Sequence, residues 1–395
     1  MNRRTFVHTL GAGAAGLVAA GVTSTPAAAR RAAAANPFAN GPIRIGSNEN
    51  PYGPAASALA ALAEVAPTGN RYGRTVREPL IDMIAAKHDV PADSVMLSGG
   101  SGDILRAVST VFTSPTRAIV GGTPSYESPM RTAEGLGHAV KRIPLKPDMT
   151  LDLDAMAEAA IGAGLFYICN PNNPTATALP AGAIAAAIER VLAASPETHV
   201  LVDEAYFEYA DLPGFGSAAP LVASYPQVII ARTFSKIHGM AGMRVGYAIA
   251  QPETLGKMQA AHSSSGMSVM SLAAATASLR DAAHIEQQIA LNREVRQMTV
   301  DAFTAAGYTV ADSHANFIFV RTGHDAAAFQ AACRELNVLA GRPFPPALDW
   351  ARISIGTKEE MEAAIPVFMR VLSMPAERVA RADRTGLDRL PTELT

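Results

Sequence analysis

A lysine and an arginine stand in an otherwise apolar stretch of the chain, RTFSKIHGMAGMRVGY, which runs from Arg232 to Tyr247. Lys236 lies among small and apolar residues, and the stretch contains no acidic side chain. Burial in such surroundings lowers the pKa of an amine, and a lysine whose pKa is lowered is a nucleophile at neutral pH. Arg244, eight residues later, keeps its charge and suits a phosphate group. The stretch therefore predicts a reactive amine beside an anion site.

Two acidic residues, Asp203 and Glu204, close the apolar run HVLVDEAY. Adjacent strand residues point to opposite faces, so only one of these carboxylates can enter a given site. A metal site of the Walker type needs the loop GxxxxGK[ST], and the sequence contains none. Because a buried carboxylate needs a positive partner, we expect a bound ligand to supply one for Asp203.

Two turns carry small or polar residues that suit a ligand. SGGSGDIL opens an expected helix, and the N–H groups of a helix N-terminus form an anion site, to which Ser101 adds a donor. CNPNNPT follows an apolar run, and its asparagines and prolines indicate a rigid turn that presents amide side chains. Turns like SGGSGDIL are common in α/β proteins, so this signal is not specific. A turn with as many asparagines and prolines as CNPNNPT is seldom needed for structure alone, so it indicates a ligand more strongly.

These groups together describe one ligand. A phosphate would bind to Ser101, Ser235 and Arg244. Asp203 would pair with a cationic ring nitrogen, and Lys236 would react with an aldehyde. Pyridoxal 5′-phosphate carries all three groups, so the sequence predicts this cofactor, bound to Lys236 as a Schiff base.

The elements that position these residues predict an α/β fold. Over residues 61–275, short apolar runs alternate with helical segments, which is typical of a mostly parallel sheet covered on both faces. Such sheets bind ligands at the carboxyl ends of their strands, where the residues singled out here fall. Residues 276–375 predict a smaller α+β domain, after an N-terminal arm (30–60) and before a polar tail (376–395).

The chain resembles the fold-type I aminotransferases, and among them the histidinol-phosphate aminotransferases. The matching motifs occur in the family's order over nearly all of the chain after the first thirty residues: NENPYGP, RYG, SGGSGDIL, TPSY, NPNNPT, VDEAY, TFSKIHGMAGMRVGY, ANF and RISIGTKEE. The resemblance implies a large domain with a mostly parallel seven-stranded sheet. It also implies transfer of an amino group from an L-amino acid, or an amine like histidinol phosphate, to a 2-oxo acid such as 2-oxoglutarate.

The resemblance implies a role for each matching cofactor residue. Lys236 would bind the cofactor and move a proton, and Asp203 would keep the pyridine nitrogen protonated. Asn173 and Tyr206 would bond to the ring's phenolic oxygen, and Tyr126 would stack on the ring. The phosphate would be held by Gly100, Ser101, Gly102, Thr233, Ser235 and Arg244.

Substrate and subunit contacts are implied in the same way. Arg352 would bind the substrate α-carboxylate through a bidentate pair. Asn50, Tyr52 and Arg342 would complete the substrate site, and no metal takes part. Tyr72 resembles the tyrosine that reaches the phosphate of a neighbouring subunit, which implies a homodimer.

Three departures from the family pattern bear on these roles. Ala176 replaces a glycine, and because alanine does not readily adopt a positive φ, we expect the turn to differ slightly. Gly73 follows Tyr72 where proline is usual. Arg342 stands one place later than the arginine that helps to bind a distal phosphate, which bears on the choice of substrate.

The first 29 residues predict an export signal. Arg3 and Arg4 precede a Gly/Ala-rich apolar run and a small-residue cleavage site, as in twin-arginine signal peptides, although an ordinary secretory signal or a membrane anchor is the alternative. We therefore expect a periplasmic or secreted protein without a membrane span after cleavage. Because histidinol phosphate is a cytoplasmic intermediate, export favours an aromatic or other amino-acid donor.

Composition limits the remaining choices. The 395 residues are 49% hydrophobic and carry a net charge of −2, which gives no basic field for nucleic acid. A decarboxylase like threonine-phosphate decarboxylase remains an alternative, whereas a regulator that binds the cofactor would need a basic DNA-binding domain. His238 is expected to pack or to support Lys236 indirectly. Cys169 and Cys333 are expected to be separate buried thiols.

Overall fold

The computed structural model describes residues 41–261, 266–375 and 379. The expected signal segment, the first part of the N-terminal arm and nearly all of the polar tail lie outside these residues. Within the described part of the chain, no helix is both long enough and apolar enough to cross a membrane.

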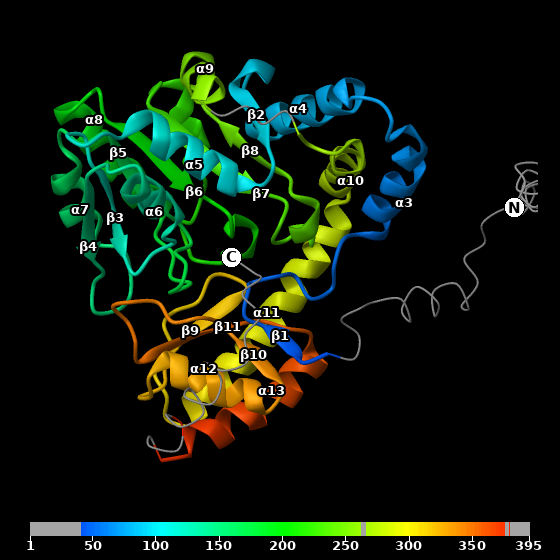
Figure 1. Cartoon of the computed structure of the whole chain (residues 1–395), viewed down its shortest axis with the longest axis vertical. Helices are drawn as coiled ribbons and strands as arrows, with labels where there is room; N and C mark the ends of the chain where they lie inside the picture. The colour runs from blue at the N-terminus through cyan, green and yellow to red at the C-terminus, as the bar shows by residue number, and fades with distance from the viewer. Residues whose placement is uncertain (1–40, 262–265, 376–378, 380–395) are drawn as a thin grey trace, which may run out of the picture. The chain divides into compact units, whose positions relative to one another are not determined.

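A seven-stranded sheet forms the larger part of the fold (Figure 1). In their spatial order, its strands are β2 (Val95–Ser98), β8 (Gly246–Ile249), β7 (Val228–Thr233), β6 (His199–Asp203), β5 (Leu165–Cys169), β3 (Ile119–Thr123) and β4 (Val140–Pro144). Only β8 runs antiparallel to its neighbours in this sheet, and the other strands are parallel. The predicted mostly parallel α/β fold is confirmed.

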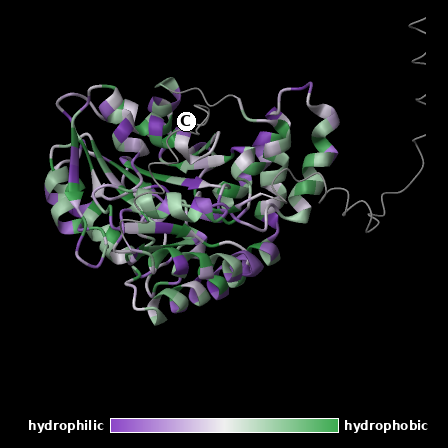
Figure 2. Cartoon of the chain, turned by 60° about the horizontal axis from the view of Figure 1, so that its bottom comes forward, coloured by the Kyte–Doolittle hydropathy of each residue, from purple (hydrophilic) through white to green (hydrophobic). Residues whose placement is uncertain are grey.

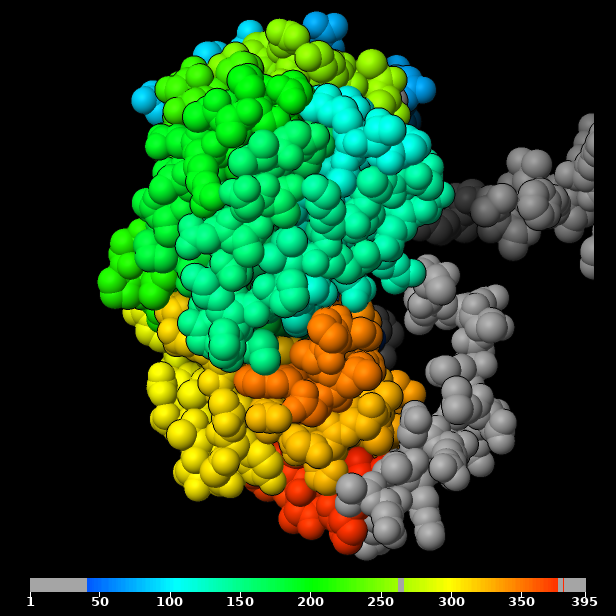
Figure 3. All heavy atoms as spheres, turned by 90° about the vertical axis from the view of Figure 1, so that its left-hand side faces the viewer, coloured from blue at the N-terminus to red at the C-terminus, as the bar shows by residue number. Residues whose placement is uncertain are grey.

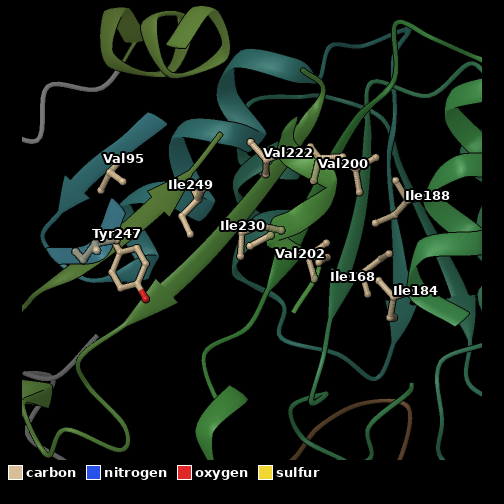
Figure 4. Close-up of a cluster of buried hydrophobic side chains, with 14 of the residues drawn as sticks. Val95, Ile168, Ile184, Ile188, Val200, Val202, Val222, Ile230, Tyr247 and Ile249 are labelled. Carbon is tan, nitrogen blue, oxygen red and sulfur yellow. The ribbon is translucent and has the colours of Figure 1, made fainter. Parts of the chain in front are cut away.

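The strands of this sheet other than the edge strand β4 are buried on both faces because helices cover both faces. In β5, Leu165 and Tyr167 pack in one hydrophobic cluster, whereas Phe166 and Ile168 pack in another. Figure 4 shows the second cluster, in which side chains from the strands meet Ile184 of a covering helix. This two-sided burial explains why the strands are continuous apolar runs in the sequence.

The helices fall into two layers. The cluster that contains Leu165 is completed by α5 (Ser101–Phe112), α6 (Ser128–Gly135) and α9 (Pro252–Ala261). The cluster that contains Phe166 is completed by α3 (Ala56–Val65), α4 (Arg74–His88), α7 (Leu153–Ala160), α8 (Ala181–Ala194) and α10 (Val269–Arg280). Figure 2 shows mostly hydrophobic residues along the strands and mixed hydrophobic and hydrophilic residues along the helices.

The C-terminal part has its own core and two small sheets. The elements are α11 (Ala282–Ala305), β9 (Phe317–Arg321), α12 (Ala326–Glu335), β10 (Val338–Ala340), β11 (Trp350–Ser354) and α13 (Lys358–Leu372). β9 and β11 pair antiparallel, and β10 pairs in parallel with β1 (Ile43–Ile45) from the other end of the chain. Figure 1 shows α11 (yellow) running from α10 towards these sheets. Helix α13 begins with a capping box formed by Thr357 and Glu360.

The loop between β10 and β11 packs against the loop that joins β4 to α7. Phe344 and Ala347 form a small cluster with Phe319 and Trp350, and Met149 packs against it. Figure 3 shows the orange segment around residues 340–350 directly below the blue-green surface of the large-sheet region. Arg342 and Phe344 of the loop between β10 and β11 line the cavity described next.

The two cysteines are separate and buried, as predicted. Cys169 lies in the core of the large sheet, whereas Cys333 lies in the C-terminal core. Neither forms a disulfide in the structure.

Candidate active site

A cavity of about 690 Å³ lies at the carboxyl ends of β5, β6 and β7. Most of the predicted site residues line it: Ser101, Gly102, Tyr126, Asn173, Asp203, Tyr206, Thr233, Ser235, Lys236, Arg244, Arg342 and Arg352. They come from seven separate segments of the chain. The strand ends of the parallel sheet meet at one edge and gather most of them, whereas Arg342 and Arg352 come from the C-terminal part.

Lys236 lies three residues after the end of β7, with its amine directed towards the N-terminal segment. Its Nζ donates to the backbone carbonyls of Asn48 over 3.0 Å and of Ser47 over 3.2 Å. Burial, with the charge of Arg352 as the next cause, lowers the pKa of Lys236 to about 7. A substantial fraction of this amine is therefore uncharged near neutral pH, as a nucleophile requires.

Asp203 ends β6 and faces the cavity, whereas Glu204 faces away from it. Burial raises the pKa of Asp203 to about 7, and its Oδ1 accepts from the backbone N–H of Ala205 over 3.2 Å. Glu204 instead forms a buried ion pair with Arg232 over 2.7 Å. A positive group beside Asp203 would therefore stabilise its carboxylate form, and a protonated ring nitrogen could be this group.

The N-terminus of α5 and Arg244 border one end of the cavity. Gly100 has a φ of +89° and precedes α5, and a Cβ at this position would lie only 2.3 Å from Nη2 of Arg244. Nη1 of Arg244 donates to Ser235 Oγ over 3.3 Å. Among the residues that the structure describes, no carboxylate forms an ion pair with Arg244. This end of the cavity suits a phosphate group.

Arg352 of β11 lies at another side of the cavity. Its Nη1 donates to Asn173 Oδ1 over 2.8 Å and its Nη2 to the Gly46 carbonyl over 2.5 Å, but its buried Nε has no hydrogen-bond partner. Burial lowers the pKa of this guanidinium to about 10. Within the described ranges, no carboxylate pairs with Arg352, so an anionic ligand group would complete its contacts.

Three polar side chains of the site form a hydrogen-bonded cluster that centres on Tyr206. Its phenol oxygen accepts from Asn48 Nδ2 over 3.0 Å and from Asn173 Nδ2 over 3.3 Å. Burial raises the pKa of Tyr206, so the phenol is neutral and can donate its own proton. Tyr126 also lines the cavity, and burial raises its pKa as well.

These residues fit pyridoxal phosphate. Arg244 and the start of α5 could present cationic and N–H groups to a phosphate, Asp203 could pair with a protonated ring nitrogen, and the Lys236 amine could react with an aldehyde. The absence of a side chain at Gly100 allows the Arg244 guanidinium to lie against the start of α5, where a Cβ would overlap it. The chemistry of the donor set therefore matches the predicted cofactor.

Besides Gly100, which directly precedes the lining residue Ser101, three predicted residues do not line this cavity. Tyr72 is fully exposed, and Tyr52 is partly exposed. Asn50 uses its amide within the protein, since its Nδ2 donates to the Ile237 carbonyl and its Oδ1 accepts from the Tyr52 N–H. The single chain thus gives these three residues no contact with the cavity.

His238 points away from the cavity, although it lies two residues after Lys236. Its Nδ1 lies 2.8 Å from Ser278 Oγ, and its ring packs 4.5 Å from that of Phe234. Burial lowers its pKa to about 4, so the imidazole is neutral. His238 has the packing role that was expected as one of its alternatives.

Several cavity residues escaped the sequence interpretation. They are Arg44, Gly46, Ser47, Asn48, Glu49, Cys169, Ala205, Ala241, Gln330, Leu339, Ala340 and Phe344. Asn48 is the most connected of them, because it is buried, bonds to Tyr206 and exchanges two hydrogen bonds with Ser354. Its motif, NENPYGP, was available as a signal, but the motif alone does not show which asparagine enters the cavity.

The structure shows how the turn at the end of NPNNPT accommodates an alanine. Ala176 adopts the left-handed conformation, with a φ of +62°, that a glycine would take. Its N–H bonds to the Asn172 carbonyl, its carbonyl accepts from the His314 N–H, and its methyl group is fully buried. These contacts hold the strained residue in place.

Comparisons with known proteins agree with this geometry. A family model described as aminotransferase class I and II matches residues 40–368. The histidinol-phosphate aminotransferase of Symbiobacterium thermophilum is 37% identical over 325 residues, which cover 80% of this chain and 87% of that protein. The aromatic amino acid aminotransferase of Thermobifida fusca is 34% identical over 329 residues, covering 82% and 89%.

A solved structure adds the cofactor. The histidinol-phosphate aminotransferase from Sinorhizobium meliloti, in complex with pyridoxal 5′-phosphate, matches with a TM-score of 0.76 and 27% identity, covering 83% of this chain and 90% of that one. These relatives are aminotransferases, and they give no support to the decarboxylase alternative. The chain therefore belongs to the class I and II aminotransferase family and is an enzyme of fold type I that transfers amino groups with pyridoxal phosphate.

Proposed function

We propose that Lys236, Asp203, Arg244 and Arg352 carry the transamination of an L-amino acid with a 2-oxo acid. The observation that carries this proposal is the distribution of charge in one cavity. A lysine with a pKa of about 7 and a carboxylate with a pKa of about 7 lie between two arginines that have no carboxylate partner among the described residues. Such an arrangement suits a ligand with a phosphate at one end and a substrate carboxylate at the other.

Each residue has a distinct task in this proposal. When bound, pyridoxal phosphate withdraws electrons from the Cα–H bond of the donor and carries the amino group between the two substrates. Lys236 moves the proton between the donor Cα and the cofactor C4′. Asp203 holds a proton on the ring nitrogen, and Arg352 binds the substrate α-carboxylate in a fixed orientation.

The remaining contacts support these tasks. Tyr206 and Asn173 would bond to the phenolic oxygen of the ring, and Tyr126 would pack on the face of the ring. The phosphate would be held by Gly100, Ser101, Gly102, Thr233, Ser235 and Arg244. The support for these roles is that all of them except Gly100 line the same cavity, while Gly100 contacts Arg244.

A spectroscopic experiment tests the assignment of Lys236. The purified enzyme is expected to absorb visible light with its cofactor attached, and borohydride is expected to fix the cofactor covalently. Lys236→Ala should lose both properties, whereas Lys257→Ala, which removes an exposed lysine of α9, should keep them. Covalent fixation in the Lys236→Ala protein would contradict the assignment.

A donor panel tests the reaction. L-amino acids and histidinol phosphate, each supplied with 2-oxoglutarate, should give the corresponding 2-oxo acid or, from histidinol phosphate, the corresponding ketone, with at least one L-amino acid as a good donor. Efficient turnover of histidinol phosphate alone would contradict an L-amino acid donor. Release of CO₂ without an oxo product would instead support the decarboxylase.

The homodimer and the role of Tyr72 belong to the same proposal. Tyr72 is fully exposed and lies two residues before α4, so it suits a contact with a second subunit. The family resemblance suggests that it reaches the cofactor phosphate of that subunit. Mixing the inactive variants Tyr72→Ala and Lys236→Ala should restore activity, because a hybrid dimer contains one intact site. Absence of restored activity in a verified hybrid would place Tyr72 outside the partner's site.

Export by the twin-arginine route is proposed from Arg3 and Arg4 alone, because this segment lies outside the described residues. Cell fractionation should find the wild-type enzyme in the periplasm or the medium. Replacement of both arginines by lysine should retain it in the cytoplasm, and unchanged export would contradict the twin-arginine route.

A further inference from the structure

An ion pair borders the cavity near the loop between β10 and β11. Nη2 of Arg342 lies 2.9 Å from Oε2 of Glu127, which directly follows Tyr126 and precedes α6. Only 25% of the surface of the Glu127 side chain is exposed, against 47% for Arg342, so the pair is partly shielded from water. Shielding of this kind strengthens the attraction between the two charges. The guanidinium that faces the cavity is thus already neutralised by the protein.

Phe344 relates Arg342 to the carboxylate-binding arginine. The guanidinium carbon of Arg342 lies 4.1 Å from the centre of the Phe344 ring, and that of Arg352 lies 4.7 Å from the same centre. Both cations therefore contact one aromatic side chain. A substrate that binds Arg352 through its α-carboxylate would place its side chain close to Phe344 and Arg342.

The other cations of the cavity have different partners. Under the function proposed above, Arg244, Lys236 and Arg352 bind the cofactor and the α-carboxylate. Arg44 lies 3.8 Å from Glu49, so this second cation at the cavity also has a carboxylate beside it. The part of the cavity left for the substrate side chain is therefore close to electrically neutral.

We propose that Glu127 is a specificity-determining residue, because it neutralises Arg342 and so favours substrates whose side chains are uncharged. A substrate with a distal carboxylate or phosphate has to compete with Glu127 for the guanidinium. An aromatic or aliphatic side chain instead packs on Phe344 and leaves the ion pair intact. This inference rests on the proposed function, since it assumes that Arg352 binds the α-carboxylate.

Single-turnover kinetics of the complete holoenzyme test this proposal. The absorbance change of the cofactor is followed after mixing with L-phenylalanine, L-glutamate or L-aspartate, so no acceptor is needed. Glu127→Gln is expected to raise the apparent second-order rate constant for the two anionic donors, relative to L-phenylalanine, by about tenfold or more. An unchanged ratio would overturn the proposal.

Two matched variants separate specificity from general damage. Asp349→Asn makes the same chemical change in the exposed pair of Arg321 and Asp349, outside the cavity, and should leave the ratio unchanged. In an Arg342→Gln background, Glu127→Gln should change the ratio by less than about twofold, because no guanidinium is released. An equally large change in that background would show that Glu127 acts without Arg342 and would also overturn the proposal.

Failure of the proposed function gives a different result. If the wild-type holoenzyme held its cofactor but reacted with none of the amino donors in the panel, the role of Arg352 and the transamination itself would be contradicted. If it reacted readily and Glu127→Gln left the ratio unchanged, only the specificity inference would fall.

Discussion

Arg352 and Asn173 share a hydrogen bond of 2.8 Å, in which the guanidinium donates to the amide oxygen. The amide nitrogen of Asn173 donates in turn to the phenol of Tyr206. One amide therefore connects the group that would bind the substrate carboxylate with the group that would bind the cofactor ring. A change at Asn173 should affect both.

Asn173→Asp should weaken substrate binding. The new carboxylate would lie beside Arg352 and compete with the substrate carboxylate, so the KM values of donor and acceptor should rise by about tenfold or more. Steady-state kinetics check this result. The exposed Asn337→Asp, the same change at a residue that does not line the cavity, is the control and should have normal KM values. Equal KM values for wild type and Asn173→Asp would contradict the proposed position of the substrate carboxylate.

The lowered pKa of Lys236 should appear in the pH dependence of stability. Its pKa falls from 10.5 in the unfolded chain to about 7 in the folded protein, so between these values the unfolded chain binds the extra proton. The free energy of unfolding should therefore gain from Lys236 as the pH rises through this range. Urea denaturation of the cofactor-free protein at about pH 7.5 and about pH 9.5 measures the slope.

Lys236→Met should reduce this slope and should raise stability most at the lower pH, because it removes a buried charge that opposes folding. Lys257→Met, at an exposed lysine, should leave the slope as in the wild type. A slope that is identical in wild type and Lys236→Met would show that the amine keeps its ordinary pKa.

Loss of the Arg232 guanidinium should destabilise the protein strongly. Arg232 is buried between Glu204 and Glu208, at 2.7 Å and 3.1 Å. Arg232→Met leaves the Glu204 carboxylate buried without its cation, so the free energy of unfolding should fall by about 3–5 kcal/mol. Chemical denaturation measures this loss.

The matched control for that prediction is Arg321→Met, which breaks the exposed pair with Asp349. Its effect should be below about 1 kcal/mol, because water screens exposed pairs. Equal losses for the two variants would mean that the buried pair contributes no more than a surface pair.

Ala176 should tolerate glycine but not valine. Glycine relieves backbone strain of about 1–2 kcal/mol at the positive φ, but it removes a buried methyl group worth about 0.8 kcal/mol and adds flexibility to the unfolded chain. The free energy of unfolding should therefore change by less than about 1 kcal/mol. Ala176→Val adds a β-branched side chain at a buried, left-handed position and should cost about 2 kcal/mol or more. Thermal or urea denaturation of both variants distinguishes these outcomes.

The sheet and the chemistry at its edge could be predicted because both depend on local patterns. The strand LFYIC and the VLV centre of HVLVD are continuously apolar, since helices cover both faces of the sheet. Asp203 and Lys236 follow such strands directly, and strand ends meet at one edge. The spatial order of the strands and the reversed direction of β8 were not predictable, because they depend on packing between distant segments.

The rest of the site depends on contacts that no local pattern contains. Glu127 and Arg342 are 215 positions apart, and only the folded chain brings them together. Within NENPYGP, Asn48 itself has a φ of +55°, and its amide bonds to Tyr206. The amide of Asn50 bonds to the backbone instead. The motif located the segment, but the backbone turn decides which side chain faces the cavity.

The pairing of β1 with β10 places the first described strand next to one of the last, with Ile43 opposite Val338. Directly after β1, backbone carbonyls accept hydrogen bonds from Lys236 and Arg352. The cavity wall after β1 is synthesised early, whereas β10, with which β1 pairs, is synthesised late. The site can therefore become catalytically competent only when synthesis is nearly complete. Any maturation of the N-terminus must also spare Ile43 and the residues after it, since a shorter polypeptide would lose the oxygens that orient its reactive amine.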